Sequence, residues 1–142
     1  EPPLKQCYES LRQVMNPPNE HRWLFHGTTH EAVPKIVADG YNRSFCGKNA
    51  TVYGQGVYFA KNIEYSAQST YSPSDSSGFK HILASRVLVG TFCVGRSDQK
   101  VPDIMNSNQR YDTTVNSLSD PTIFVVYKDM QAIPEYELKF KL

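Results

Sequence analysis

The sequence has almost no excess of charge of one sign. Fifteen Lys and Arg residues against fourteen Asp and Glu residues give a net charge of +1 over 142 residues. A protein that holds the phosphate backbone of nucleic acid ordinarily has a strongly basic surface, because Lys and Arg side chains neutralise the phosphates. The balanced charge therefore argues against nucleic acid as a partner.

Cysteine is scarce, and the spacing of its three residues does not pair them. Cys7, Cys46 and Cys93 are odd in number and far apart, so they offer neither a disulfide framework nor the CxxC pairs of a zinc site. This usage is typical of a reducing compartment. We therefore expect an intracellular protein, of the cytoplasm or nucleus, that holds no metal.

Long hydrophobic runs are also absent. The longest runs, such as residues 123–127, fall well short of the roughly 20 apolar residues that a membrane-spanning helix needs. No charged start followed by an apolar stretch marks a secretion signal, so we expect a soluble protein without a membrane partner. The sequence also lacks a GxGxxG motif at a strand-to-helix turn, which excludes the Rossmann route to a dinucleotide.

The length fits a single domain and a single core, and we expect a monomer. Apolar residues at three- and four-residue spacing predict a helix over 4–15, ended by the Pro-rich segment 16–19. A short strand over 22–26 follows. A second helix is predicted over 30–38, with Thr29 as its N-cap and Gly40 just past its end.

The second half of the chain is predicted to be mostly β. Residues 41–56 form a long loop that suggests a functional, ligand-covering segment, and 63–71 form a helix. The predicted strands are 57–60, 81–94 with a break at Gly90, 122–127, and the alternating segment 136–142, while 95–121 is polar and irregular. Helices early and strands late indicate an α+β domain.

Two motifs carry the functional information. Leu24-Phe25-His26-Gly27-Thr28 is followed about thirty residues later by Gly54-Gln55-Gly56-Val57-Tyr58-Phe59-Ala60. Together they resemble the nicotinamide-binding signature of the poly(ADP-ribose) polymerase-like, or diphtheria-toxin-like, ADP-ribosyltransferases. Further matching segments are Tyr65-Ser66-Ala67-Gln68, Tyr71-Ser72, Arg86-Val87-Leu88, Tyr111-Asp112 and Ile123-Phe124-Val125-Val126-Tyr127. Segments 40–50 and 127–136 are most similar to the mono-ADP-ribosyltransferase branch often found behind macrodomains.

The resemblance implies a catalytic domain over 1–142 built of split antiparallel sheets with flanking short helices. Its NAD-binding core covers 20–142. Residues 1–19, a helix and a Pro-rich connection, correspond to only part of the family's usual N-terminal region. The implied co-substrate is NAD+, without a metal.

The resemblance also implies a role for each residue of the NAD+ site. Gly27 and Ser66 clamp the nicotinamide carboxamide, Tyr58 and Tyr71 stack on the nicotinamide ring, and His26 bonds a ribose hydroxyl of the adenosine half. Arg43 lies in the loop over the diphosphate, where its fork of donors suits phosphate. The implied cofactor contacts are His26, Gly27, Thr28, Arg43, Tyr58, Tyr65, Ser66 and Tyr71. The other histidines, His21, His30 and His81, have no such context and are predicted to lie at the surface.

The sequence departs from the polymerising members at one decisive position. These carry a catalytic Glu at the start of the strand that matches 122–127, where this chain has Ile123. The catalytic positions therefore read His26, Tyr58 and Ile123. Because isoleucine cannot accept a hydrogen bond or act as a base, we predict transfer of one ADP-ribose to a protein acceptor, which could be the enzyme itself.

Members of this kind are thought to use an Asp or Glu of the acceptor in place of the missing base. Three alternatives stay open at this point. An internal carboxylate could substitute, from Asp120, Asp129, Glu135 or Glu137, although Glu137 is predicted to face solvent. The chain could be a non-catalytic NAD- or ADP-ribose-binding module. It could also modify a terminal phosphate of nucleic acid.

Overall fold

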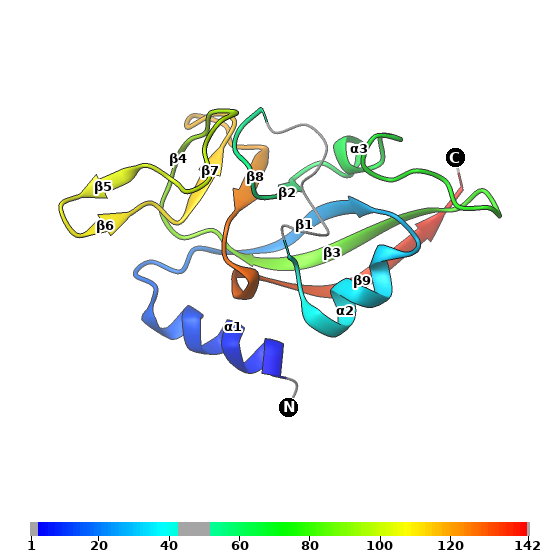
Figure 1. Cartoon of the computed structure of the whole chain (residues 1–142), viewed down its shortest axis with the longest axis horizontal. Helices are drawn as coiled ribbons and strands as arrows, with labels where there is room; N and C mark the ends of the chain where they lie inside the picture. Colours follow the sequence, from blue (N-terminus) through cyan, green and yellow to red (C-terminus); the bar gives the residue numbers. More distant parts are fainter. Residues whose placement is uncertain (1–2, 43–51, 142) are drawn as a thin grey trace.

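The computed structural model describes residues 3–42 and 52–141. Figure 1 shows a twisted sheet of seven strands with α1 and α2 beside it and a two-stranded hairpin projecting from one end. The helical elements are α1 (Pro3–Val14), α2 (Ala32–Asp39), α3 (Ile63–Ser66) and the 3-10 helix η1 (Asp129–Gln131). The strands are β1 (Glu20–Thr28), β2 (Val57–Ala60), β3 (Lys80–Leu88), β4 (Phe92–Val94), β5 (Ile104–Asn106), β6 (Gln109–Arg110), β7 (Thr113–Val115), β8 (Ile123–Val126) and β9 (Ala132–Phe140).

The main sheet is almost divided in two. Its strand order is β4-β7-β8-β2-β1-β3-β9, and β5 pairs with β6 separately. β1 pairs with β3 from Glu20 to Thr28, whereas its register with β2 is the pair Phe25 and Ala60. Neighbouring strands are antiparallel except for β4 and β7, which run parallel. The predicted α+β fold with split, mainly antiparallel sheets is confirmed.

The alternation of side chains in β2 and β8 divides the buried residues into two clusters. Successive side chains of a strand point to opposite faces, and β2 pairs with β8 along its whole length. One face contributes Val57, Phe59, Phe124 and Val126 to the larger core, beneath Val33 and Ile36 of α2. The opposite face contributes Tyr58, Ile123, Val125 and Tyr127 to a smaller cluster.

Helix α1 is attached to the sheet through a buried polar network. The predicted apolar face is only partly covered: Tyr8 is buried, whereas Cys7 and Val14 are exposed. The Tyr8 hydroxyl donates to Glu20 at 2.6 Å, and the Arg86 guanidinium donates to the same carboxylate at 2.8 Å. Burial and the bond to Glu20 raise the pKa of Tyr8, so it remains a neutral donor. This network fixes α1 against the start of β1.

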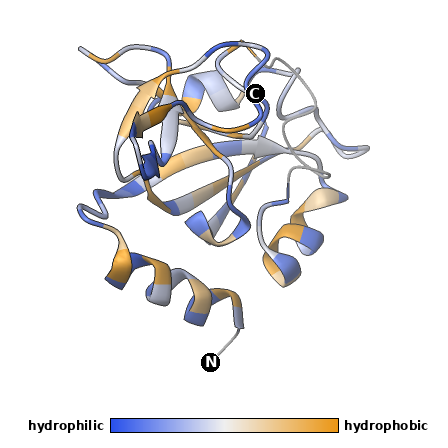
Figure 2. Ribbon diagram, turned by 60° about the vertical axis from the view of Figure 1, so that its left-hand side comes forward, coloured by the Kyte–Doolittle hydropathy of each residue, from blue (hydrophilic) through white to orange (hydrophobic). Residues whose placement is uncertain are grey.

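The first half of the chain otherwise follows its local signals. Helix α2 begins at Ala32 with Glu31, not the predicted Thr29, as its N-cap residue, although the Thr29 hydroxyl accepts a hydrogen bond from the Ala32 N–H at 3.1 Å. Gly40 ends α2 with a φ of 84°. Figure 2 shows hydrophobic and hydrophilic residues alternating along α1 and α2. No helix among residues 3–42 and 52–141 is long and apolar enough to cross a membrane.

Two predictions of secondary structure were wrong. The helix predicted over 63–71 ends at Ser66, because the chain turns at Gln68, whose carbonyl accepts from the Tyr71 and Ser72 N–H groups. The region 95–121 contains β5, β6 and β7. β7 was missed because Thr113 and Thr114 are polar yet fully buried, with the Thr113 hydroxyl bonded to the Val89 carbonyl at 2.7 Å.

Candidate active site

His26 lies near the end of β1, where the two halves of the sheet meet. Its side chain is only 6 % exposed and packs against the aromatic rings of Tyr41 and Phe59, with ring centroids 5.0 and 5.5 Å away. Nδ1 lies 2.7 Å from the backbone carbonyl of Tyr58. The His26 side chain on β1 therefore connects the first motif to the second, which lies on the neighbouring strand β2.

This hydrogen bond determines the tautomer of His26. A carbonyl oxygen can only accept, so Nδ1 carries the proton and Nε2 keeps its lone pair. Burial lowers the pKa of His26 to about 4, even though the bond to the Tyr58 carbonyl acts in the opposite direction. At neutral pH the ring is uncharged, and Nε2 is suited to accept a hydrogen bond from a hydroxyl group.

Gly27 and Ser66 lie in direct backbone contact. A Cβ atom built on Gly27 would lie 2.2 Å from the Ser66 carbonyl oxygen and 3.0 Å from the Tyr71 Cβ, so no larger residue fits without moving α3. The Ser66 hydroxyl donates to the Phe25 carbonyl at 2.9 Å. Since backbone groups of residues i and i+2 point to the same side of a strand, those of Gly27 also point towards α3.

Tyr65 and Tyr71 stack on each other beside this glycine. Their ring centroids are 4.9 Å apart at an interplanar angle of 26°, and their hydroxyls share a hydrogen bond of 2.8 Å. Burial and this bond raise the pKa of Tyr65. Tyr71, which is predicted to stack on the nicotinamide ring, therefore lies in a stacked pair with Tyr65, next to the backbone of Gly27.

The ring of Tyr58 on β2 lies on the same face of the sheet as Ile123 on β8. Its hydroxyl donates to the Gly54 carbonyl at 2.8 Å and accepts from the Tyr53 N–H at 2.9 Å. Burial raises the pKa of Tyr58 to about 12, so it stays protonated. The hydroxyl is bonded to the chain just before β2, and Tyr58 as a whole is 6 % exposed, so only its ring is left to contact a ligand.

Ile123 begins β8 directly opposite Ala60. It is 8 % exposed and packs in the cluster of Tyr58, Val125 and Tyr127, with Tyr53 and Tyr65 at its edge. The apolar side chains around it are aromatic and aliphatic. Glu137 and Glu135 lie on β9, at the far edge of the sheet from β8.

The remaining predicted residues fall into two groups. Thr28 is buried at the end of β1, one residue beyond Gly27 and opposite His81 of β3. Arg43 lies outside the described residues. The fold thus brings together His26, Gly27, Thr28, Tyr58, Tyr65, Ser66, Tyr71 and Ile123 around the ends of β1 and β2 and the start of α3.

A comparison with family models decides the family. Residues 2–96 match the model described as the poly(ADP-ribose) polymerase catalytic domain. The chain belongs to this family. The matched segment includes both motifs and the Tyr65–Tyr71 pair, whereas Ile123 lies beyond it.

The chain is similar to members of this family that are named protein mono-ADP-ribosyltransferases. It is 41 % identical over 146 residues to protein mono-ADP-ribosyltransferase PARP10 of Mus musculus and 40 % identical over 147 residues to protein mono-ADP-ribosyltransferase PARP14 of Homo sapiens. Both alignments cover 99 % of this chain. The chain spans only 15 % and 8 % of the length of these two relatives.

A solved structure of the same family shares the fold. The crystal structure of the PARP domain of Arabidopsis RADICAL-INDUCED CELL DEATH1 superposes with a TM-score of 0.76 at 19 % identity, covering 98 % of this chain and 77 % of that chain. At this identity the similarity concerns the fold alone. It supports the split-sheet architecture in which the polymerase-family motifs meet.

The sequence analysis missed Tyr41 beside His26 and wrongly placed His81 at the surface. Tyr41 was assigned only to a loop, yet it is 1 % exposed, packs on the His26 ring and shares a hydrogen bond of 2.5 Å with Ser85. An aromatic residue directly after the helix-ending Gly40 was the available signal. The prediction that His81 lies at the surface was wrong, because His81 is 1 % exposed.

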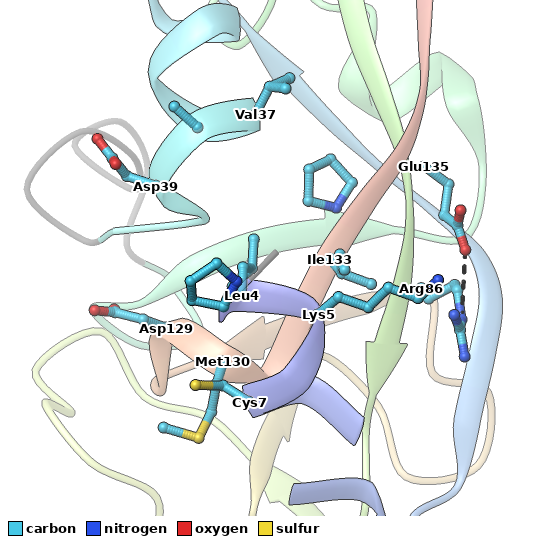
Figure 3. Close-up of a pocket in the computed structure, with 13 residues that line it drawn as sticks. Leu4, Lys5, Cys7, Val37, Asp39, Arg86, Asp129, Met130, Ile133 and Glu135 are labelled. Atoms are coloured by element: carbon cyan, nitrogen blue, oxygen red, sulfur yellow. Dashed lines mark ion pairs between the residues drawn. The ribbon is translucent and has the colours of Figure 1, made fainter. Parts of the chain in front are cut away.

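A separate cavity lies on another side of the molecule, between α1, α2 and β9 (Figure 3). Its volume is about 620 Å³, and none of the predicted NAD+ contacts lines it. Arg86 and Glu135 form an ion pair of 3.5 Å at its rim. The apolar part of its lining is Pro3, Leu4, Val37, Ala38, Met130, Ile133 and Pro134.

Proposed function

We propose that this chain is the catalytic domain of a protein mono-ADP-ribosyltransferase, which transfers one ADP-ribose unit from NAD+ to a protein acceptor and releases nicotinamide. The observation that carries the proposal is the pairing of an intact His26–Gly27–Tyr58 arrangement with an isoleucine in the apolar cluster beside Tyr58. The names of the relatives PARP10 and PARP14 support it.

The proposed roles follow from the donors and acceptors at the end of β1. The backbone groups of Gly27 offer a donor and an acceptor to the nicotinamide carboxamide, and the Ser66 hydroxyl can turn from Phe25 to the same group. The Nε2 atom of neutral His26 accepts from a ribose hydroxyl. Holding NAD+ in one reactive orientation is the main contribution expected of such a site, because its leaving group is already activated.

The reaction itself breaks one bond and forms another. The bond between the ribose C1′ and the nicotinamide nitrogen breaks, its electron pair goes to the ring, and nicotinamide leaves as a neutral molecule. C1′ passes through an oxocarbenium-like state that an acceptor carboxylate oxygen attacks, forming an ester. An ionised acceptor needs no proton removed, so Ile123 is compatible with transfer to Asp or Glu.

The same residue limits the product. Extension of the chain requires removal of a proton from a ribose hydroxyl, and Ile123 cannot accept it. The absence of a general base commonly costs about 10²- to 10⁴-fold in rate. We therefore propose a pentosyltransferase that works as a monomer, uses NAD+ as co-substrate, and stops after one unit on each acceptor carboxylate.

Intact-protein mass spectrometry of the purified domain, incubated with and without NAD+, tests the proposal. We expect mass increments of single ADP-ribose units in the wild-type protein, removable by hydroxylamine because they are carboxylate esters. The double variant His26→Ala, Tyr58→Ala should show none. His21→Ala is the matched control, since His21 lies on the same strand with its ring on Phe124, and it should label as the wild type does.

Two results would contradict the proposal. Increments of two or more units on one acceptor side chain, located by peptide fragmentation, would show that elongation proceeds without a Glu at position 123. A complete lack of increments with an added panel of Asp- and Glu-containing peptides, together with stabilisation by NAD+, would instead support the binding-module alternative.

A further inference from the structure

A second cluster of ionisable side chains lies beside the NAD+ site, on the neighbouring strand. His81 is the second residue of β3, lies opposite Thr28 and is almost completely buried. Both nitrogens of its ring reach carboxylates: Nε2 lies 2.8 Å from Asp75 Oδ2, and Nδ1 lies 2.9 Å from Glu137 Oε2. A buried imidazole held between two carboxylates is an arrangement that metal sites share with ion-pair networks.

A third potential ligand approaches from another part of the chain. His30 lies in the turn between β1 and α2, and its ring centroid is 5.0 Å from that of His81. One ligand atom each of His30, Asp75 and His81 lie within 4.8 Å of one another. His30 therefore meets Asp75 and His81, which are six residues apart, from a part of the chain that is distant in sequence.

We propose that His30, Asp75 and His81 bind a zinc ion, with Glu137 orienting the His81 ring. Ligand atoms about 2.0–2.2 Å from zinc at tetrahedral angles lie roughly 3.3–3.6 Å from one another. Zinc in place of the shared proton needs the His81–Asp75 pair to open by about half an ångström. Exposed His30 closes in by rotation of its side chain.

The two ligands that move least are held by their own hydrogen bonds. Asp75 Oδ1 accepts from the backbone N–H groups of Ser77 and Phe79, each at 2.9 Å, which leaves Oδ2 for the metal. The Ser72 hydroxyl accepts from the His81 N–H at 3.1 Å and donates to its carbonyl at 2.9 Å. Such support is what a metal site requires of the residues around its ligands.

The choice of zinc follows from the ligand set. Two imidazole nitrogens and one carboxylate oxygen suit zinc, whereas Mg²⁺ and Ca²⁺ prefer oxygen ligands alone. The bound ion would link the turn between β1 and α2, which directly follows Gly27 and Thr28, to the turn before β3. The sequence predicted no metal because it offered no paired ligand motif, and only the fold brings these three residues together.

Titration of the EDTA-treated 142-residue protein with zinc chloride, followed by calorimetry and thermal unfolding, tests the proposal. We expect one ion per chain and an unfolding temperature that rises with zinc concentration. His30→Ala should weaken binding at least about 100-fold and Glu137→Gln about 10- to 100-fold. His30 is exposed, so its variant should fold normally by circular dichroism.

The controls separate this site from other potential zinc ligands. His21→Ala and Cys7→Ser should bind zinc as the wild type does, and bound Co²⁺ should give the spectrum of a four-coordinate nitrogen and oxygen site. A thiolate charge-transfer band would place the metal on cysteine and overturn the proposal. Wild-type affinity in His30→Ala, or no saturable binding, would also overturn it and leave the cluster as an ion-pair network.

Discussion

Two buried histidines on adjacent strands have opposite protonation behaviour. His26 on β1 and His81 on β3 are 6 % and 1 % exposed. Burial lowers the pKa of His26 to about 4, because its one polar partner is a neutral carbonyl. Burial also acts to lower the pKa of His81, but the bonds to Asp75 and Glu137 outweigh it and raise the pKa. Burial alone therefore does not determine whether a histidine carries charge.

The difference assigns the two residues to different tasks. His26 is surrounded by Tyr41 and Phe59, so it is a neutral hydrogen-bond acceptor of fixed tautomer, suited to orient a ribose. His81 is surrounded by carboxylates, so it favours a cation, either a proton or a metal ion. The two histidines lie close together on one strand pair, because His26 is opposite Leu83 and His81 is opposite Thr28. Their different surroundings nevertheless suit them to different ligands.

The largest effect is expected for ADP-ribose transfer. His26→Ala removes the acceptor that we propose orients the ribose and should lower the rate of single-unit labelling about 100-fold, measured as initial rate against NAD+ concentration. His21→Ala should retain the wild-type rate. Equal losses in both variants would mean that His26 acts only through the packing of β1.

The next effect is the fall in stability at low pH that His26 contributes. In the unfolded chain His26 takes up a proton as the pH falls below its ordinary pKa of 6.5, whereas in the folded protein it stays neutral until about pH 4. Stability should therefore fall over this window, by roughly 3 kcal/mol from this residue. Urea unfolding between pH 7 and pH 4 should show a smaller fall in His26→Gln, and identical slopes would contradict the assignment.

His81 should show the opposite sign. Its raised pKa stabilises the folded state fully below pH 6.5, and this contribution is lost as the pH rises through the folded pKa. His81→Asn should lower the free energy of unfolding by roughly 2 kcal/mol at pH 6, and less at pH 9. A loss that grows with pH in metal-free buffer would contradict the comparison.

The smallest effect is expected for Glu137→Gln. The Glu137 side chain is 40 % exposed, so its pairing with His81 should contribute no more than about 1 kcal/mol. The substitution should nevertheless lower the pKa of His81, because one of the two carboxylates is gone, and leave that of His26 unchanged. Titration of the histidine ring signals by NMR measures both, and a shift of His26 would show that the two sites are coupled.

The elements around the candidate site could be predicted where local pattern and tertiary contacts agree. A strand over 22–26, which the structure extends to Glu20–Thr28, the buried strand 57–60 and the helix end at Gly40 could be predicted from the apolar runs and the glycine. β7 was not readable, because Thr113 and Gln131 are polar residues buried against partners far away in the chain, with Gln131 Nε2 donating to Thr113 and to the Leu88 carbonyl.

The sequence by itself determined the family, the isoleucine at position 123 and the α+β class, because these depend on residue identity and local spacing. Only the tertiary structure decided that Tyr71 stacks on Tyr65, that Tyr41 packs on His26, and that His81 is buried beside His30 and Asp75. The physical reason is that burial and pKa are set by whatever packs around a side chain. Tyr65 and Asp75 lie only six residues from their partners Tyr71 and His81, whereas His30 reaches His81 from a distant turn.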